Sequence, residues 1–175
     1  MDELKEYEGF TVKLALVDSL PVIFFSLCVV LIATTLHGTG LTFWLGLIGA
    51  SLMALSGLCK VLWKLLLGLK VGDVKILNKI FLPFMIFGFF LAVIAAAYGT
   101  VTKVINWGTV IHAMTSVPSI IFFILGICGL AVMVYVKSTN KRDEFNRDAK
   151  KNWIAQCVNA FAQFMIFLSI LFAIH

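Results

Sequence analysis

Five apolar segments, each long enough to cross a lipid bilayer, restrict the fold of this chain more than any other feature. A helix needs about 20 consecutive apolar residues to cross the hydrocarbon core of a membrane. Such runs predict spans over residues 14–36, 41–62, 80–98, 117–136 and 153–174. Because lipid offers no hydrogen bonds to an exposed backbone, each span must be a helix. The sequence therefore predicts an all-α, polytopic membrane helix bundle that forms one integral membrane domain over residues 1–175.

The composition excludes a water-soluble domain of ordinary kind. Hydrophobic residues make up 61% of the chain and charged residues 13%, whereas soluble domains carry about 25% charged residues. The net charge of +5 does not indicate nucleic-acid binding, because the basic residues flank apolar segments and are not gathered on one folded face. We expect the lipid bilayer as the partner, with a second copy or another membrane subunit as a further partner and no nucleic acid.

The distribution of basic residues predicts the orientation in the membrane. With five alternating spans, residues 1–13, 60–79 and 137–151 fall on one side, and they contain every Lys and Arg except Lys103. The positive-inside rule places that side in the cytoplasm. We therefore predict a multi-pass protein of the cell membrane with its N-terminus inside and its C-terminus outside. The less apolar stretch 99–116 then forms an outer loop.

Two segments of the chain resemble each other and suggest an internal repeat. Residues 34–95 align without gaps with residues 114–175 at an offset of 80. Matched residues include Gly46/Gly126, Gly49/Gly129, Met53/Met133 and the block Phe84-Met85-Ile86-Phe87, which recurs as Phe164-Met165-Ile166-Phe167. This alignment would relate two consecutive spans to two later ones as a parallel repeat, an arrangement found in some transporters. Coincidence among apolar segments is the alternative.

Small residues mark two faces for close helix packing. In the second span they are Gly46, Gly49, Ala50 and Gly57, and in the third they are Gly88, Ala92 and Ala96. Small residues at helical spacing let backbones approach closely, which is how helices in lipid gain packing energy.

The most specific feature of the sequence is a stripe of amides on the fifth span. Spacings of four, three and four place on one helix face the side chains of Asn152, Gln156, Asn159 and Gln163. Because amides in hydrocarbon need partners, this face should look into the bundle, while Phe161 and Phe172 point towards lipid or a partner subunit. Two interpretations remain open: a solute pathway, or hydrogen bonds that hold helices together.

Three charged residues lie near the inner ends of the spans. Lys60 and Lys64 are expected to extend to the lipid headgroups, with a role as anion ligands as the alternative. Asp18 is expected to cap the first span, with an ion pair to Lys60 or Lys64 as the alternative. On this interpretation the bundle holds no buried charge, which weighs against ion-coupled pumping.

No catalytic, metal or cofactor site is predicted. The four cysteines have neither CxxC nor Cys/His metal spacing. The histidines, His37, His112 and His175, lie at the outer boundary and could meet to bind a metal or haem, but none pairs with another at helical spacing.

Three functions of different classes fit the sequence. The first is a small permease or channel component whose pathway is lined by the amides of the fifth span. The second is a non-catalytic membrane subunit or regulator that acts through helix contacts. The third, a membrane redox enzyme using the outer histidines, is the least favoured, so an enzyme is not expected. The candidate ligand or pathway residues are Gln156, Asn159, Gln163, Lys60, Lys64 and Asp18.

The topology can be tested with cysteine reporters at Asn146 and Thr102. Membrane-impermeant labelling should report opposite sides, with Asn146 cytoplasmic, because the two positions lie on either side of an odd number of spans. Both reporters on one side would overturn the five-span topology and the charge argument.

Overall fold

The computed structural model describes residues 7, 9–36, 40–139 and 148–175, and these residues form six α-helices. Five of the helices are long and apolar enough to cross a membrane. The chain is therefore a multi-pass integral membrane protein with five candidate spans, as predicted. The helices are α1 (Val12–Leu36), α2 (Leu41–Gly68), α3 (Lys75–Val101), α4 (Trp107–Thr115), α5 (Ser119–Ser138) and α7 (Ala149–Ile174).

Several helices extend beyond the predicted spans. The polar connection expected between Lys70 and Lys79 is shorter, because α3 already begins at Lys75. Helix α7 begins at Ala149, where the Asp148 side chain accepts a hydrogen bond from the backbone N–H of Lys151 at 3.0 Å. Such a cap satisfies a backbone donor that has no partner within the helix. Polar residues at the span ends thus continue the helices past the apolar runs.

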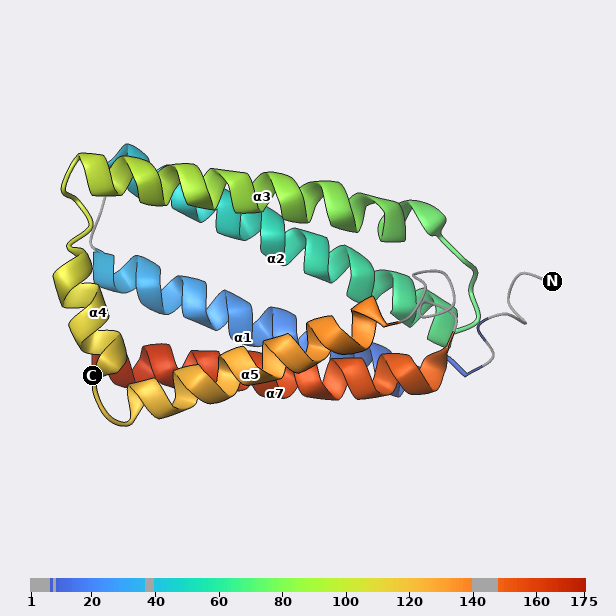
Figure 1. Cartoon of the computed structure of the whole chain (residues 1–175). Helices are drawn as coiled ribbons and strands as arrows, with labels where there is room; N and C mark the ends of the chain where they lie inside the picture. Colours follow the sequence, from blue (N-terminus) through green and yellow to red (C-terminus); the bar gives the residue numbers. More distant parts are fainter. Residues whose placement is uncertain (1–6, 8, 37–39, 140–147) are drawn as a thin grey trace.

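The expected outer loop at 99–116 contains a short helix, α4. Its N-terminus is capped by the Asn106 side chain, which accepts a hydrogen bond from the backbone N–H of Thr109 at 3.3 Å. Its nine residues include no buried side chain. Helix α4 lies across the end of the bundle where α3 ends and α5 begins (Figure 1).

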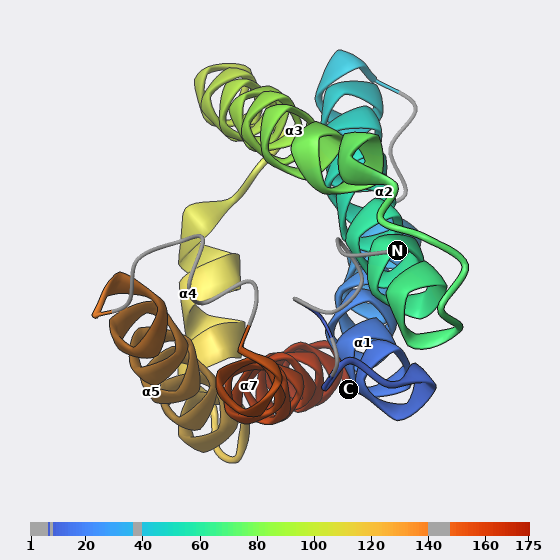
Figure 2. The same cartoon turned by 90° about the vertical axis from the view of Figure 1, so that its right-hand side faces the viewer.

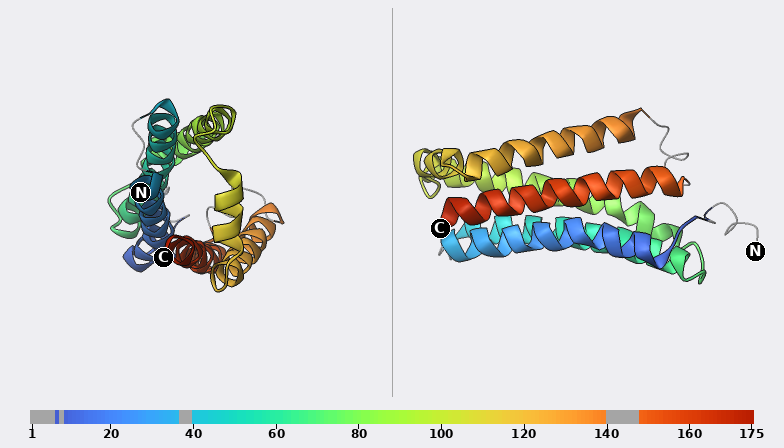
Figure 3. Two further views of the ribbon diagram at one scale, coloured as in Figure 1. Left: turned by 90° about the vertical axis from the view of Figure 1, so that its left-hand side faces the viewer. Right: turned by 90° about the horizontal axis from the view of Figure 1, so that it is seen from below.

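The long helices form an open arc in the order α3–α2–α1–α7–α5. Figure 2 shows this arc along the helix direction, with α3 and α5 at its two ends. The left panel of Figure 3 gives the opposite view. Helices α3 and α5 are not among the pairs that pack extensively. We call the end of the bundle where α1 and α7 begin the lysine-rich end, because it carries Lys13, Lys70, Lys75, Lys79 and Lys150.

Glycines bring neighbouring helices of the arc into close contact, as the small-residue faces predicted for α2 and α3. A Cβ on Gly49 of α2 would lie 2.7 Å from the backbone oxygen of Gly88 in α3. On the other side of the arc, a Cβ on Gly129 of α5 would lie 2.8 Å from the Cβ of Ala162 in α7. The buried Ser119 hydroxyl also donates to the backbone oxygen of Ser169 at 2.9 Å, joining α5 to α7.

The helix contacts do not follow the offset of the possible repeat. Gly49 and Gly129 are matched in the alignment, yet Gly49 packs against Gly88 whereas Gly129 packs against Ala162. At an offset of 80, Ala162 corresponds to Leu82 and not to Gly88. The pairs α2–α3 and α5–α7 therefore pack in different registers. The repeat between 34–95 and 114–175 stays a prediction from the sequence.

A buried aromatic cluster joins α1 and α2 at the lysine-rich end. It contains Phe10, Leu14, Trp63 and Leu67. The Trp63 indole N–H donates to the Asp73 carboxylate at 2.8 Å, so its polar atom is satisfied. This cluster fixes the ends of α1 and α2 relative to each other beside the site described below.

The close approach of α2 and α3 yields a prediction about stability. Gly49→Ala should lower the melting temperature in detergent, because its Cβ would meet backbone atoms that cannot move aside independently. Overpacking of this kind costs about 1–3 kcal/mol. Gly46→Ala is the matched control on the same helix, since its Cβ would lie 3.7 Å from Ala95, an ordinary contact. Equal melting temperatures for the two variants would contradict the packing described here.

Candidate functional site: a polar cavity inside the helix arc

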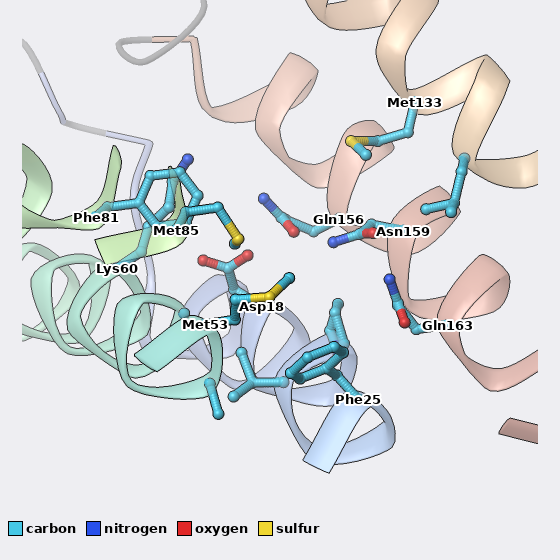
Figure 4. A pocket seen from close by; sticks show the side chains of 15 residues that line it. Asp18, Phe25, Met53, Lys60, Phe81, Met85, Met133, Gln156, Asn159 and Gln163 are labelled. Atoms are coloured by element: carbon cyan, nitrogen blue, oxygen red, sulfur yellow. The ribbon is translucent and has the colours of Figure 1, made fainter. Parts of the chain in front are cut away.

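A cavity of about 350 Å³ lies on the inner side of the arc, and every long helix contributes to its lining. Figure 4 shows the side chains that line it. Its charged and amide side chains come from α1, α2 and α7, and the remainder of the lining is apolar. The lining residues are Asp18, Pro21, Val22, Phe25, Met53, Ala54, Gly57, Lys60, Phe81, Met85, Leu130, Met133, Gln156, Asn159 and Gln163.

Three amides of the α7 stripe line the cavity, as their helical spacing predicted. They are Gln156, Asn159 and Gln163, and all three side chains point towards the cavity (Figure 4). The other side of α7 is exposed, with 50% of Phe161 and 44% of Phe172 accessible. Ala155 and Ala162 of the same helix are buried. The fourth amide of the stripe, Asn152, does not line the cavity and donates to the backbone oxygen of Asp148 at 3.1 Å.

The expectation that Asp18 caps the first span is wrong. Helix α1 begins at Val12, so Asp18 lies within the helix. Its carboxylate instead forms an ion pair with the Lys64 ammonium at 3.0 Å, the alternative that the sequence left open. Asp18 lines the cavity, and Lys64 stands behind it between α1 and α2.

Lys64 does not extend to the headgroups, because its side chain is fully buried. Removing a charge from water is costly unless an opposite charge replaces the lost hydration. The expectation of a bundle without buried charge is therefore also wrong: the wall between α1 and α2 contains a buried ion pair.

Lys60 also turns towards the interior and lines the cavity. It lies one turn before Lys64 on α2. Its ammonium nitrogen is 4.6 Å from the centre of the Phe81 ring of α3, a distance at which the ring's electron-rich face attracts a cation. The cavity wall thus brings together five of the six residues that the sequence proposed, and the sixth, Lys64, pairs with one of them.

The apolar lining includes residues that sequence reasoning did not identify. Thioether side chains reach the cavity from three helices, at Met53 of α2, Met85 of α3 and Met133 of α5. Met53 and Met133 are matched in the alignment at an offset of 80, and that match was the one feature of the sequence that pointed to them. Methionine is flexible and fills irregular spaces, so these side chains can adapt to different occupants of the cavity.

The cavity leaves polar atoms without protein partners. Gln156 is only 3% exposed. Its side-chain oxygen is buried and has no hydrogen-bond donor among the described residues. No hydrogen bond between described side chains involves Asn159 or Gln163 either. An unpaired buried carbonyl loses its hydration without compensation, so these groups need water or a ligand in the cavity.

The described residues contain no group of three or more His, Cys, Asp or Glu side chains that could hold a metal ion. His112 and His175 lie at the end of the bundle opposite the lysine-rich end. His37 lies outside the described residues.

Comparison of the chain with protein-family models, with curated proteins and with solved structures found no match.

The buried ion pair yields a prediction that uses a double-mutant cycle. Asp18→Asn and Lys64→Met should each destabilise the protein in detergent by about 3–5 kcal/mol, because each leaves one buried charge without its partner. The double variant should recover most of that loss, since both charges are gone. Thermal or denaturant unfolding measures the three variants. Additive losses in the double variant would show that the two side chains do not interact.

Proposed function

We propose that this protein is a small permease or channel component whose solute pathway includes the cavity lined by the α7 amides. One observation carries the proposal. Gln156, Asn159 and Gln163 face a cavity bounded by all five long helices, and the hydrogen bonds among the described residues leave these amides unused. Amides that served to hold helices together would instead be bonded across a helix interface.

The ion pair at the cavity wall adds support. Ionisable residues within membrane spans are costly, and they commonly mark solute or ion pathways. Asp18 lies at the cavity surface. Lys64, which does not line the cavity, forms the ion pair that balances the charge of Asp18. A solute in the cavity would therefore meet a carboxylate, a lysine and three amides.

The proposal includes an orientation. Asp18 lies six residues after the start of α1, and Gln156 lies seven after the start of α7. At 1.5 Å per residue, both are about 10 Å from the lysine-rich end of their helices. On the positive-inside rule this end faces the cytoplasm, with the C-terminus of α7 outside. The cavity would then take up or release its solute on the cytoplasmic side.

Water access to the cavity tests the proposal without knowledge of the solute. In a variant with Cys28, Cys59, Cys128 and Cys157 replaced by serine, a single cysteine is introduced as Asn159→Cys. A membrane-impermeant methanethiosulfonate reagent should modify this cysteine in vesicles that expose the lysine-rich end, because the cavity admits water. The reagent should not modify it in vesicles of opposite orientation, because the lining beyond Phe25 and Met53 is apolar apart from Thr42.

Phe161→Cys is the matched control, two residues away on the lipid-facing side of α7, and it should remain unmodified in both orientations. Failure to modify Asn159→Cys from either side would favour the alternative function, a non-catalytic subunit held together by its helix contacts.

A further inference from the structure

A second cavity of about 320 Å³ adjoins the first on the side away from the lysine-rich end. Phe25 and Met53 line both cavities, so these two side chains lie between the two spaces. The second cavity lies against α1, α2 and α3. Its lining residues include Val29, Ile32, Leu47, Ala50, Phe89 and Ala92.

The two cavities differ sharply in polarity. The first presents Asp18, Lys60 and the three amides. Among the described residues that line the second, Thr42 alone has a polar side chain, and it lies in the first turn of α2 at the far end. A molecule that filled both spaces would therefore need a polar group at one end and an apolar body at the other.

Gln156 indicates what the polar end must offer. Gln156 lines the first cavity, and its buried side-chain oxygen finds no donor among the described residues. A ligand with a hydroxyl or amino group would supply the missing N–H or O–H, and a purely apolar molecule would not. The site therefore selects for a hydrogen-bond donor in the head group.

The arc offers such a molecule a route from the membrane. Helices α3 and α5 stand at the two ends of the arc and do not pack extensively against each other (Figure 2). Met85 of α3 and Met133 of α5 line the first cavity from these two ends. Both are flexible side chains, so we expect an apolar chain to enter the first cavity between them.

We propose that the ligand of this site is an amphiphile with a single apolar chain and a head group that donates hydrogen bonds. Its head group binds at Gln156 and Asn159, and its chain passes Phe25 and Met53 into the second cavity. This inference rests on the proposed function and names its solute class.

Photo-crosslinking with one defined probe tests the inference. The probe is a 1-monoacylglycerol with a 16-carbon chain and a diazirine at the chain end, added to the full-length protein in lipid nanodiscs. After irradiation, mass spectrometry should find the label on residues of the second cavity such as Val29, Leu47 and Ala92. Excess unmodified monoacylglycerol should suppress this labelling, whereas excess glycerol or hexadecane should not, because each lacks one half of the recognised structure.

Two variants probe the two ends of the site. Gln156→Leu should reduce the competable labelling about tenfold, since it removes the hydrogen-bond acceptor for the head group. Ala50→Phe should abolish it by filling the second cavity while leaving the amides in place. Phe161→Leu, on the lipid-facing side of α7, is the matched control and should label like the natural protein. Size-exclusion profiles establish that each variant is folded, and Ala50→Phe alone decides if Gln156→Leu does not fold.

Labelling confined to outward-facing residues such as Phe87 and Phe90, which are 61% and 59% exposed, would overturn the inference. Labelling of the second cavity that persisted in Ala50→Phe would also overturn it. The proposed function fails separately. If Asn159→Cys is accessible to water but the second cavity is not labelled, the pathway stands and the amphiphile is wrong. If neither result is obtained, both proposals fail.

Discussion

The absence of water from the hydrocarbon core is the constraint on which the rest of this structure depends. It requires every backbone group in the spans to find a partner within its own helix, and it removes the hydrophobic effect as a force between helices. Close packing takes its place. Gly49 against Gly88 and Gly129 against Ala162 bring backbones together on the two sides of the arc. The same constraint turns polar side chains away from lipid, so the amides of α7 face inwards.

The order of helices around the arc explains why a polar cavity forms. Helix α1 stands between α2 and α7, so residues from both neighbours converge on its inner face. Asp18 meets Lys64 of α2 on one side of α1, while Gln156 approaches the same cavity from the other. Because α3 and α5 remain apart, the arc does not close into a fully packed bundle. Space is left where the polar groups of three helices meet.

The arrangement also divides the interior along the membrane normal. The charges lie nearer the lysine-rich end and the amides extend from there to the middle of α7, whereas the lining beyond Phe25 and Met53 is apolar apart from Thr42. The ion pair contributes to this division. Lys64 is buried between α1 and α2 and balances the charge of Asp18, so that a carboxylate can remain at the surface of a cavity within the spans. The cavity thus combines groups that bind polar atoms with an adjoining space whose lining is apolar apart from Thr42.

The sequence by itself determined the five spans, the inward face of α7 and the close-packing glycines of α2 and α3. Each of these follows from length or helical periodicity, which are properties of one segment at a time. Only the tertiary structure decided that Asp18 pairs with Lys64 and does not cap α1, that Lys60 lies over Phe81, and that α4 occupies the expected loop. It also brought Met85 and Met133 to the cavity. These features depend on which helix stands beside which, and at what depth. Spacing along one helix carries no information about that order.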